Sequence, residues 1–153
     1  MPRFVPLDPK TVATLRAGGP DAYGMPAERA VSDGHGNPCR SCLHDIPEGA
    51  EMLIAAARPF PEPQPYAETG PVFLCAEDCV PWDGEGLPPI ATSADYLLKG
   101  YRADHRIAYG TGAIVPAGEM LDRAAGILAD PAIAFVDMRS ARNNCWQARI
   151  VRD

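Results

Sequence analysis

Residues 133–151 read IAFVDMRSARNNCWQARIV, and this stretch decides the fold class. Two largely apolar runs, at 133–138 and 146–151, flank a polar segment at 140–144. Short apolar runs on either side of a polar segment are typical of two strands joined by a hairpin loop. The end of the chain is therefore expected to form a β-hairpin.

Alternation along the strands predicts which side chains of this hairpin share a face. Successive side chains of a strand point to opposite faces of the sheet. We therefore expect Ile133 and Phe135 to share one face of the first strand. In the second strand, we expect Trp146, Ala148 and Ile150 to share one face.

Further apolar runs upstream predict more strands, at 29–32, 51–58, 72–76, 96–102 and 106–115. The run at 51–58 is almost continuously apolar, so both of its faces are expected to be covered. The runs at 96–102 and 106–115 are expected to pair with each other around the short turn between them.

Two helices are expected. Asp8 can cap the first helix, Pro9 suits its first position, and the glycines at 18–19 end it. The second helix is expected over 119–129, where apolar residues line one stripe, and Pro131 stops it.

Together these elements predict an α+β fold: a mostly antiparallel sheet of about six strands with two helices and long Pro-rich loops. The proline-rich loops fall at 59–71 and 81–89. The chain has 153 residues, which is enough to bury one core, so residues 1–153 are expected to form a single domain.

Charge and hydropathy exclude several classes of partner. The formal net charge is −6 and no run of lysine or arginine exists, so neither nucleic acid nor an anionic membrane is an expected partner. No apolar stretch approaches the roughly 20 residues of a membrane helix, and residues 1–10 lack a signal-peptide pattern. A cytoplasmic location is expected, and the sequence identifies no partner.

Two cysteine pairs form the most specific motif. Cys39 and Cys42 form a C-x2-C pair, and Cys75 and Cys79 form a C-x3-C pair. Two short turns of this kind can direct four thiolates at one cation, and zinc favours such a tetrahedral shell. A closed shell of four thiolates would be structural, because catalysis needs an open coordination position.

Three other interpretations of these residues remain open. The cysteines could be buried or free thiols, since unpaired Cys is among the most buried residue types. The C-x2-C pair could be a redox site, which requires Cys39 at a helix N-terminus. His44 could replace one thiolate as a metal ligand, or act as a general base. Cys145 lies outside both pairs and is expected in the core.

Candidate ligand-binding residues lie in the loops and the last hairpin. A polar group near the hairpin, with Arg139, Arg142 and Asn143, could grip a carboxylate or phosphate through forked donors. In the loops, Arg40, Tyr66 and Glu68 are further candidates.

Two classes of function follow from these candidates. The first is a binding or accessory protein with a structural zinc site, because no catalytic motif is present. The second is a small enzyme with a loop-built pocket; its residues would be Cys39, Arg40, His44, Tyr66 and Glu68. A pocket that joins Cys39 or His44 to Glu68 would favour the enzyme.

Three segments, PCRSCL at 38–43, PYAETGPVF at 65–73 and the stretch 133–149 that contains NNCW, carry a family resemblance. The chain resembles the bacterial family catalogued as domain of unknown function 1203, over about residues 5–151. The resemblance implies a bacterial single-domain protein with no assigned activity. Family members often have His at the position of Cys75, which suits a metal ligand. Some lack the second cysteine of the first pair, which would empty the site.

Overall fold

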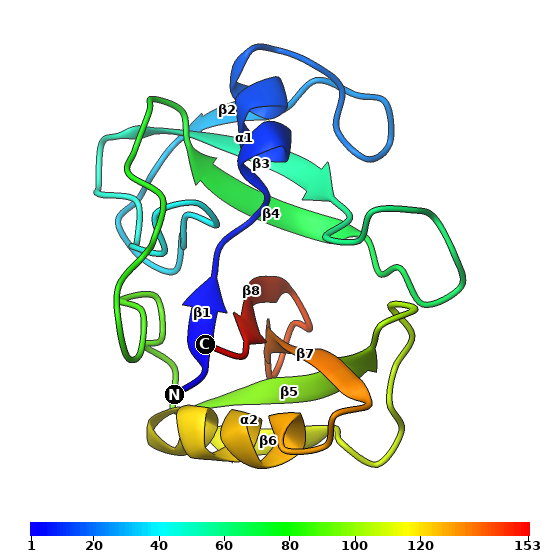
Figure 1. Cartoon of the computed structure of the whole chain (residues 1–153). Helices are drawn as coiled ribbons and strands as arrows, with labels where there is room; N and C mark the ends of the chain where they lie inside the picture. Colours follow the sequence, from blue (N-terminus) through cyan, green and yellow to red (C-terminus); the bar gives the residue numbers. More distant parts are fainter.

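The computed structural model describes residues 1–153 and contains eight strands and two α-helices (Figure 1). In chain order the elements are β1 (Arg3–Val5), α1 (Pro9–Arg16), β2 (Glu28–Val31), β3 (Glu51–Ala57), β4 (Gly70–Cys75), β5 (Asp95–Arg102), β6 (Ala113–Pro116), α2 (Met120–Leu128), β7 (Ile133–Ser140) and β8 (Trp146–Val151). A short 3-10 turn, Ala117–Glu119, leads into α2.

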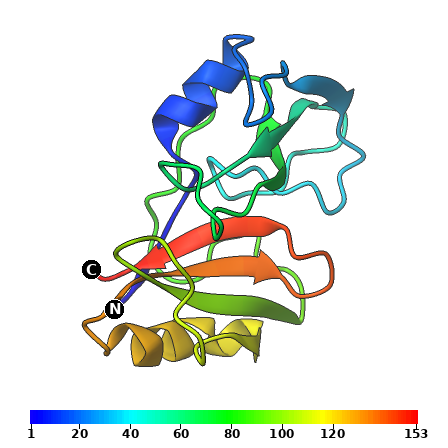
Figure 2. The ribbon, with the colours of Figure 1, turned by 90° about the vertical axis from the view of Figure 1, so that its right-hand side faces the viewer.

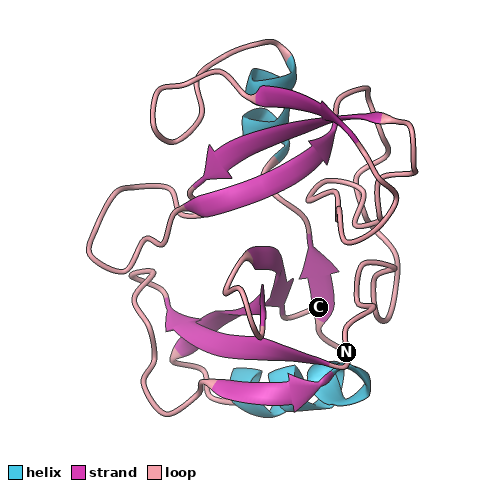
Figure 3. Cartoon of the chain, turned by 180° about the vertical axis from the view of Figure 1, so that it is seen from behind, coloured by secondary structure: helices cyan, strands magenta, loops and turns pink.

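The strands form two sheets, and every strand pair is antiparallel (Figure 3). The larger sheet has the order β1-β8-β7-β5-β6, and the smaller has the order β2-β3-β4. The predicted α+β class with mostly antiparallel strands is confirmed. The eight strands divide between two sheets, where about six in one sheet were expected. The missed strand β1 is only three residues long, too short for a recognisable period.

The helices form where capping and amphipathicity predict them. The Asp8 carboxylate accepts a hydrogen bond from the backbone amide of Thr11, and Pro9 occupies the first turn of α1. Helix α2 packs against β5 and β7 and encloses the largest hydrophobic core (Figure 2). Neither helix has the length and apolar character needed to cross a lipid bilayer.

A β-bulge places Phe135 on the face of the sheet opposite the predicted one, so that prediction is wrong. Tyr101 pairs with Phe135 and Arg102 pairs with Ile133, so β7 carries one extra residue opposite β5. Such a bulge reverses the alternation at this point. Ile133 therefore belongs to the core beneath α2, whereas Phe135 stacks on Tyr101 and packs against Phe60 on the other side of the sheet.

A second bulge places Trp146 on the face opposite that of Ala148 and Ile150, so the prediction that all three share one face is wrong. Met138 pairs with Ala148 and Arg139 pairs with Trp146, so the register shifts between them. Ala148 and Ile150 both join the core beneath α2, as expected for side chains on the same face of the strand. Trp146 instead packs into the core of the smaller sheet.

The strand expected at 106–115 is also shorter than predicted. Only its end, in β6, pairs with β5, while Ile107 makes an isolated bridge to Tyr101. Gly110 has a positive φ of 94°, which turns the chain out of extended geometry. The Thr111 hydroxyl then accepts the amide of Gly100, a bond that a neighbouring strand would otherwise supply.

Candidate functional site

The two cysteine pairs meet at the C-terminal end of β4. Cys75 is the last residue of β4, and Cys79 follows after a short turn. The loop with the first pair lies beside β4. The Arg40 backbone amide donates a hydrogen bond to the Phe73 carbonyl at 3.0 Å, and Cys39 and Phe73 form an isolated parallel β-bridge. The smaller sheet thus brings together two segments more than 30 residues apart in the sequence.

The four sulfur atoms of Cys39, Cys42, Cys75 and Cys79 lie within 4.8 Å of one another. The Cys39 and Cys79 sulfurs are 3.8 Å apart. In a tetrahedral zinc site with bonds of about 2.3 Å, neighbouring sulfurs are about 3.8 Å apart. The Cys75 amide also donates to the Cys39 sulfur at 3.3 Å. The predicted convergence of the four thiols is confirmed, and the cluster could hold a metal ion.

The first turn closes without a glycine. Leu43 has a positive φ of 55° and donates its amide to the Cys39 carbonyl at 3.0 Å. This left-handed conformation is strained for a residue with a side chain. The Leu43 side chain is fully buried in the core beneath α2, and this packing offsets the strain.

Arg16 reaches the cluster from α1. It donates from Nη2 to the Cys79 sulfur at 3.0 Å and from Nε to the Cys75 carbonyl at 3.1 Å. Its positive charge offsets part of the negative charge that four thiolates would bring around a divalent ion. Sequence reasoning missed Arg16, because no local pattern links it to cysteines about 60 residues away.

The cluster favours one ionised sulfur. The neighbouring thiols of Cys42 and Cys75 hold the pKa of Cys39 well below its ordinary value, although burial opposes this. The same interaction raises the pKa of Cys42 to about 12 and also raises the pKa of Cys75. A divalent cation would relieve this competition, because every coordinating thiol can ionise at a metal.

A family model described as protein of unknown function (DUF1203) matches residues 36–152, which include all four cysteines. The chain belongs to the DUF1203 family. No curated protein and no solved structure matches it.

In this DUF1203 chain, His44 lies outside the sulfur cluster. Its side chain is exposed, its ring edge contacts Trp82, and its Nδ1 lies 3.0 Å from the Cys42 carbonyl. The loop between Cys39 and Cys42 is a turn without a helix, so the helix N-terminus that the redox interpretation requires is not formed.

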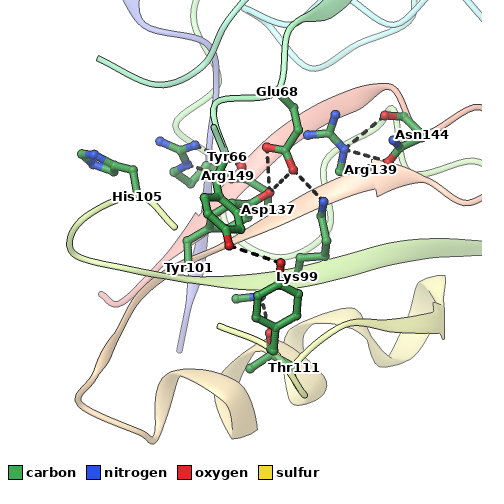
Figure 4. A network of polar contacts seen from close by, with 12 residues as sticks. Tyr66, Glu68, Lys99, Tyr101, His105, Thr111, Asp137, Arg139, Asn144 and Arg149 are labelled. Atoms are coloured by element: carbon green, nitrogen blue, oxygen red, sulfur yellow. Dashed lines mark hydrogen bonds and ion pairs between the residues drawn. The ribbon is translucent and has the colours of Figure 1, made fainter. Parts of the chain in front are cut away.

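A second polar cluster lies where the β3–β4 loop crosses the larger sheet (Figure 4). Glu68 accepts a hydrogen bond from Lys99 at 2.7 Å, and the Tyr101 hydroxyl donates one hydrogen bond that both carboxylate oxygens share, at 2.8 and 3.0 Å. Arg139 donates its Nε to Asn144, and its Nη1 is buried without a partner. Sequence reasoning found Glu68 and Arg139 but missed Lys99 and Tyr101, which face them from β5.

A buried ion pair continues this cluster. Asp137 has no exposed surface, and both of its carboxylate oxygens accept hydrogen bonds from Arg149, at 2.7 and 3.0 Å. Burial raises the pKa of Asp137, and the Arg149 guanidinium opposes that shift. The guanidinium also lies 3.7 Å from the centre of the Phe135 ring and donates to the Pro59 carbonyl. The pair therefore fastens the start of the β3–β4 loop to the sheet.

Glu68 makes a testable, pH-dependent contribution to stability. Burial raises the pKa of Glu68, but the hydrogen bonds from Lys99 and Tyr101 outweigh burial and hold the pKa below its ordinary value of 4.5. A lowered folded-state pKa stabilises the fold above pH 4.5, and this contribution is lost as the pH falls through the folded-state value. We expect Glu68→Gln to cost about 1.5–3 kcal/mol at neutral pH and progressively less below pH 4.5.

Urea unfolding of both proteins between pH 3 and pH 7 would measure this difference. Glu62→Gln is the matched control, because Glu62 is exposed in the same loop and makes no ion pair. A cost for Glu68→Gln that stays constant across this range would contradict the prediction.

The structure brings together only some of the predicted ligand-binding residues. Arg40 and Asn143 line one cavity of about 370 Å³, together with Cys145. Cys145 was expected in the core, but it precedes β8 in the hairpin loop and is only partly buried. Tyr66 lies under Arg106 and beside Tyr109, away from this cavity.

The remaining candidates are dispersed. Arg142 is largely exposed and pairs with Asp95 at 3.4 Å. Glu68 is engaged by Lys99 and Tyr101, and none of the four main cavities joins it to Cys39 or His44. The pocket that would favour the loop-built enzyme is not among them.

Proposed function

We propose that this protein is a small binding or accessory domain whose fold is stabilised by a structural zinc ion held by Cys39, Cys42, Cys75 and Cys79. The proposal rests on one observation: the four sulfurs lie within 4.8 Å of one another. Four free thiols from two distant segments have no other evident reason to converge at one point.

The donor set favours zinc. All four donors are thiols, which suit zinc or iron and do not suit magnesium or calcium. Zinc has no geometric preference of its own and accepts the tetrahedral arrangement that these turns offer. A full shell leaves no position for water or substrate, so the ion would stabilise the fold without taking part in catalysis.

The surroundings explain what such an ion would stabilise. The Ser41 carbonyl accepts a hydrogen bond from the backbone amide of Trp82, and the Leu43 carbonyl accepts one from the backbone amide of Ile90. The loop with the first cysteine pair therefore holds the proline-rich segment that follows Cys79. A metal at this point would fix three segments of irregular backbone at once.

Metal analysis tests the proposal directly. We expect about one zinc ion per chain in protein purified without metal-affinity resin, measured by inductively coupled plasma mass spectrometry. Cys79→Ser should lose the ion, whereas Cys145→Ser, which lies outside the cluster, should retain it. Iron found in place of zinc would show that the identity assigned to the metal is wrong. Protein that is free of metal and does not take up zinc would contradict the proposal.

A further inference from the structure

A polar cavity lies beside the first cysteine pair and has no assigned role. It has a volume of about 370 Å³ and lies between the loop around Arg40, the segment before β5 and the β7–β8 hairpin. This volume is near the lower end of the range of small-molecule sites, about 300–1,000 Å³. The cavity is suited to a ligand of the size of a single metabolite.

Arg40 is the buried charge of this cavity. Its side chain is only 3% exposed, yet no carboxylate lies within ion-pair distance of it. Nε donates to the Trp146 carbonyl at 2.8 Å and Nη1 to the Pro38 carbonyl at 2.7 Å. These bonds fix the guanidinium plane, and Nη2 is left without a protein acceptor. A buried guanidinium with a free nitrogen at a cavity is a binding group for an anion.

Neighbouring donors could complete an anion site. Thr92, Ser93 and Asn143 line the same cavity. Their side-chain hydroxyl and amide groups make no hydrogen bonds within the protein, although the Ser93 amide donates to the Tyr96 hydroxyl. Carboxylate oxygens accept several hydrogen bonds each, so these groups can share one carboxylate with Arg40.

An acidic group lies in the same cavity. Asp45 lines it, pairs with Pro38 in an isolated β-bridge, and makes neither an ion pair nor a side-chain hydrogen bond. The cavity therefore has one cationic and one anionic group that are not paired with each other. Asp45 would repel a phosphate dianion, and it would attract an ammonium group.

We infer that this cavity binds a small α-amino acid as its zwitterion, with the carboxylate at Arg40 and the ammonium group toward Asp45. This inference gives a ligand class to the binding role proposed above, and it does not depend on the identity of the metal. Arg40 lies between Cys39 and Cys42 in the sequence, so an ion at the cysteines would also hold the backbone that carries the binding group.

Calorimetric titration of the protein as purified, with its metal content measured in parallel, tests the inference. The probes are the common L-amino acids, propionate, propylamine and inorganic phosphate. We expect at least one amino acid to bind at least tenfold more tightly than propionate, propylamine or phosphate. Equal or tighter binding of propionate or phosphate would overturn the zwitterion assignment, and so would the absence of binding by every amino acid.

Two variants at partly or fully exposed positions avoid the risk that a change at buried Arg40 prevents folding. Asp45→Asn should weaken binding of the amino acid about tenfold and should not weaken binding of propionate, because it removes the partner of the ammonium group and relieves repulsion of an anion. Asn143→Ala should weaken both, because it removes a donor to the carboxylate. Arg142→Ala is the matched control, since Arg142 is the exposed neighbour of Asn143 and pairs with Asp95. If Arg142→Ala weakens binding as much as Asn143→Ala, the site is misplaced.

The metal measurement separates this inference from the proposed zinc site. An intact zinc content without amino-acid binding would overturn only the ligand inference. Amino-acid binding by protein that holds no metal and takes up no zinc would overturn only the zinc site.

Discussion

Cys39→Ser is expected to lower the free energy of unfolding by several kcal/mol, because metal binding and folding are coupled when the site does not exist in the unfolded chain. Cys39 is the most central of the four cysteines: its side chain has no exposed surface, and its sulfur contacts both the Cys79 sulfur and the Cys75 amide. Urea unfolding of the wild type and of Cys39→Ser, both in the presence of zinc, would measure the loss.

A control and a chelator identify the cause of that loss. Cys145→Ser should change stability by no more than about 0.5 kcal/mol, because Cys145 lies in the hairpin loop outside the cluster. A strong chelator should destabilise the wild type and remove most of the difference between it and Cys39→Ser. If the difference persists in chelator, it arises from packing of the buried thiol and not from a metal.

Asp137→Asn is expected to cost about 3–5 kcal/mol, because it leaves the Arg149 guanidinium without its anionic partner in a largely buried place. Asp137 is fully buried, and Arg149 retains only 19% of its side-chain exposure. The substitution keeps the shape of the side chain and removes the charge, so the effect reports the lost ion pair. Thermal or urea unfolding at neutral pH would measure it.

A double variant distinguishes pairing from burial. Asp137→Leu combined with Arg149→Met removes both charges and should recover most of the loss, since replacing a buried ion pair by apolar side chains is often neutral. Asp95→Asn is the control, because it breaks a pair in which Arg142 is 77% exposed, and it should cost no more than about 1 kcal/mol. A double variant as unstable as Asp137→Asn would contradict this account.

Local signals in the sequence predicted the elements that local physics determines. Asp8 and Pro9 begin α1 because capping and a fixed φ act within one turn. The cysteine spacing predicted the sulfur cluster because two short turns restrict where thiols can point. The strand bounds of β8 follow from its apolar run and match the structure at both ends.

Features that depend on strand register or on distant segments could not be predicted in this way. The two bulges of β7 and β8 send Phe135 and Trp146 to the face opposite the one that simple alternation predicts, and nothing in the sequence around them marks a bulge. Arg16 meets Cys79 only because α1 packs beside the end of β4. Lys99 becomes the partner of Glu68 because the β3–β4 loop, which joins two strands of the smaller sheet, reaches the larger sheet.

The pairing of β1 with β8 has a consequence for how quickly the chain can fold. Arg3 pairs with Val151, so β1 joins its sheet only through β8, which lies almost 150 residues later in the sequence (Figure 1). Contacts between residues so far apart in sequence require closure of nearly the whole chain, and proteins rich in such contacts fold in milliseconds to seconds, not microseconds. On the ribosome, the larger sheet cannot be completed until β8 has been synthesised and has emerged.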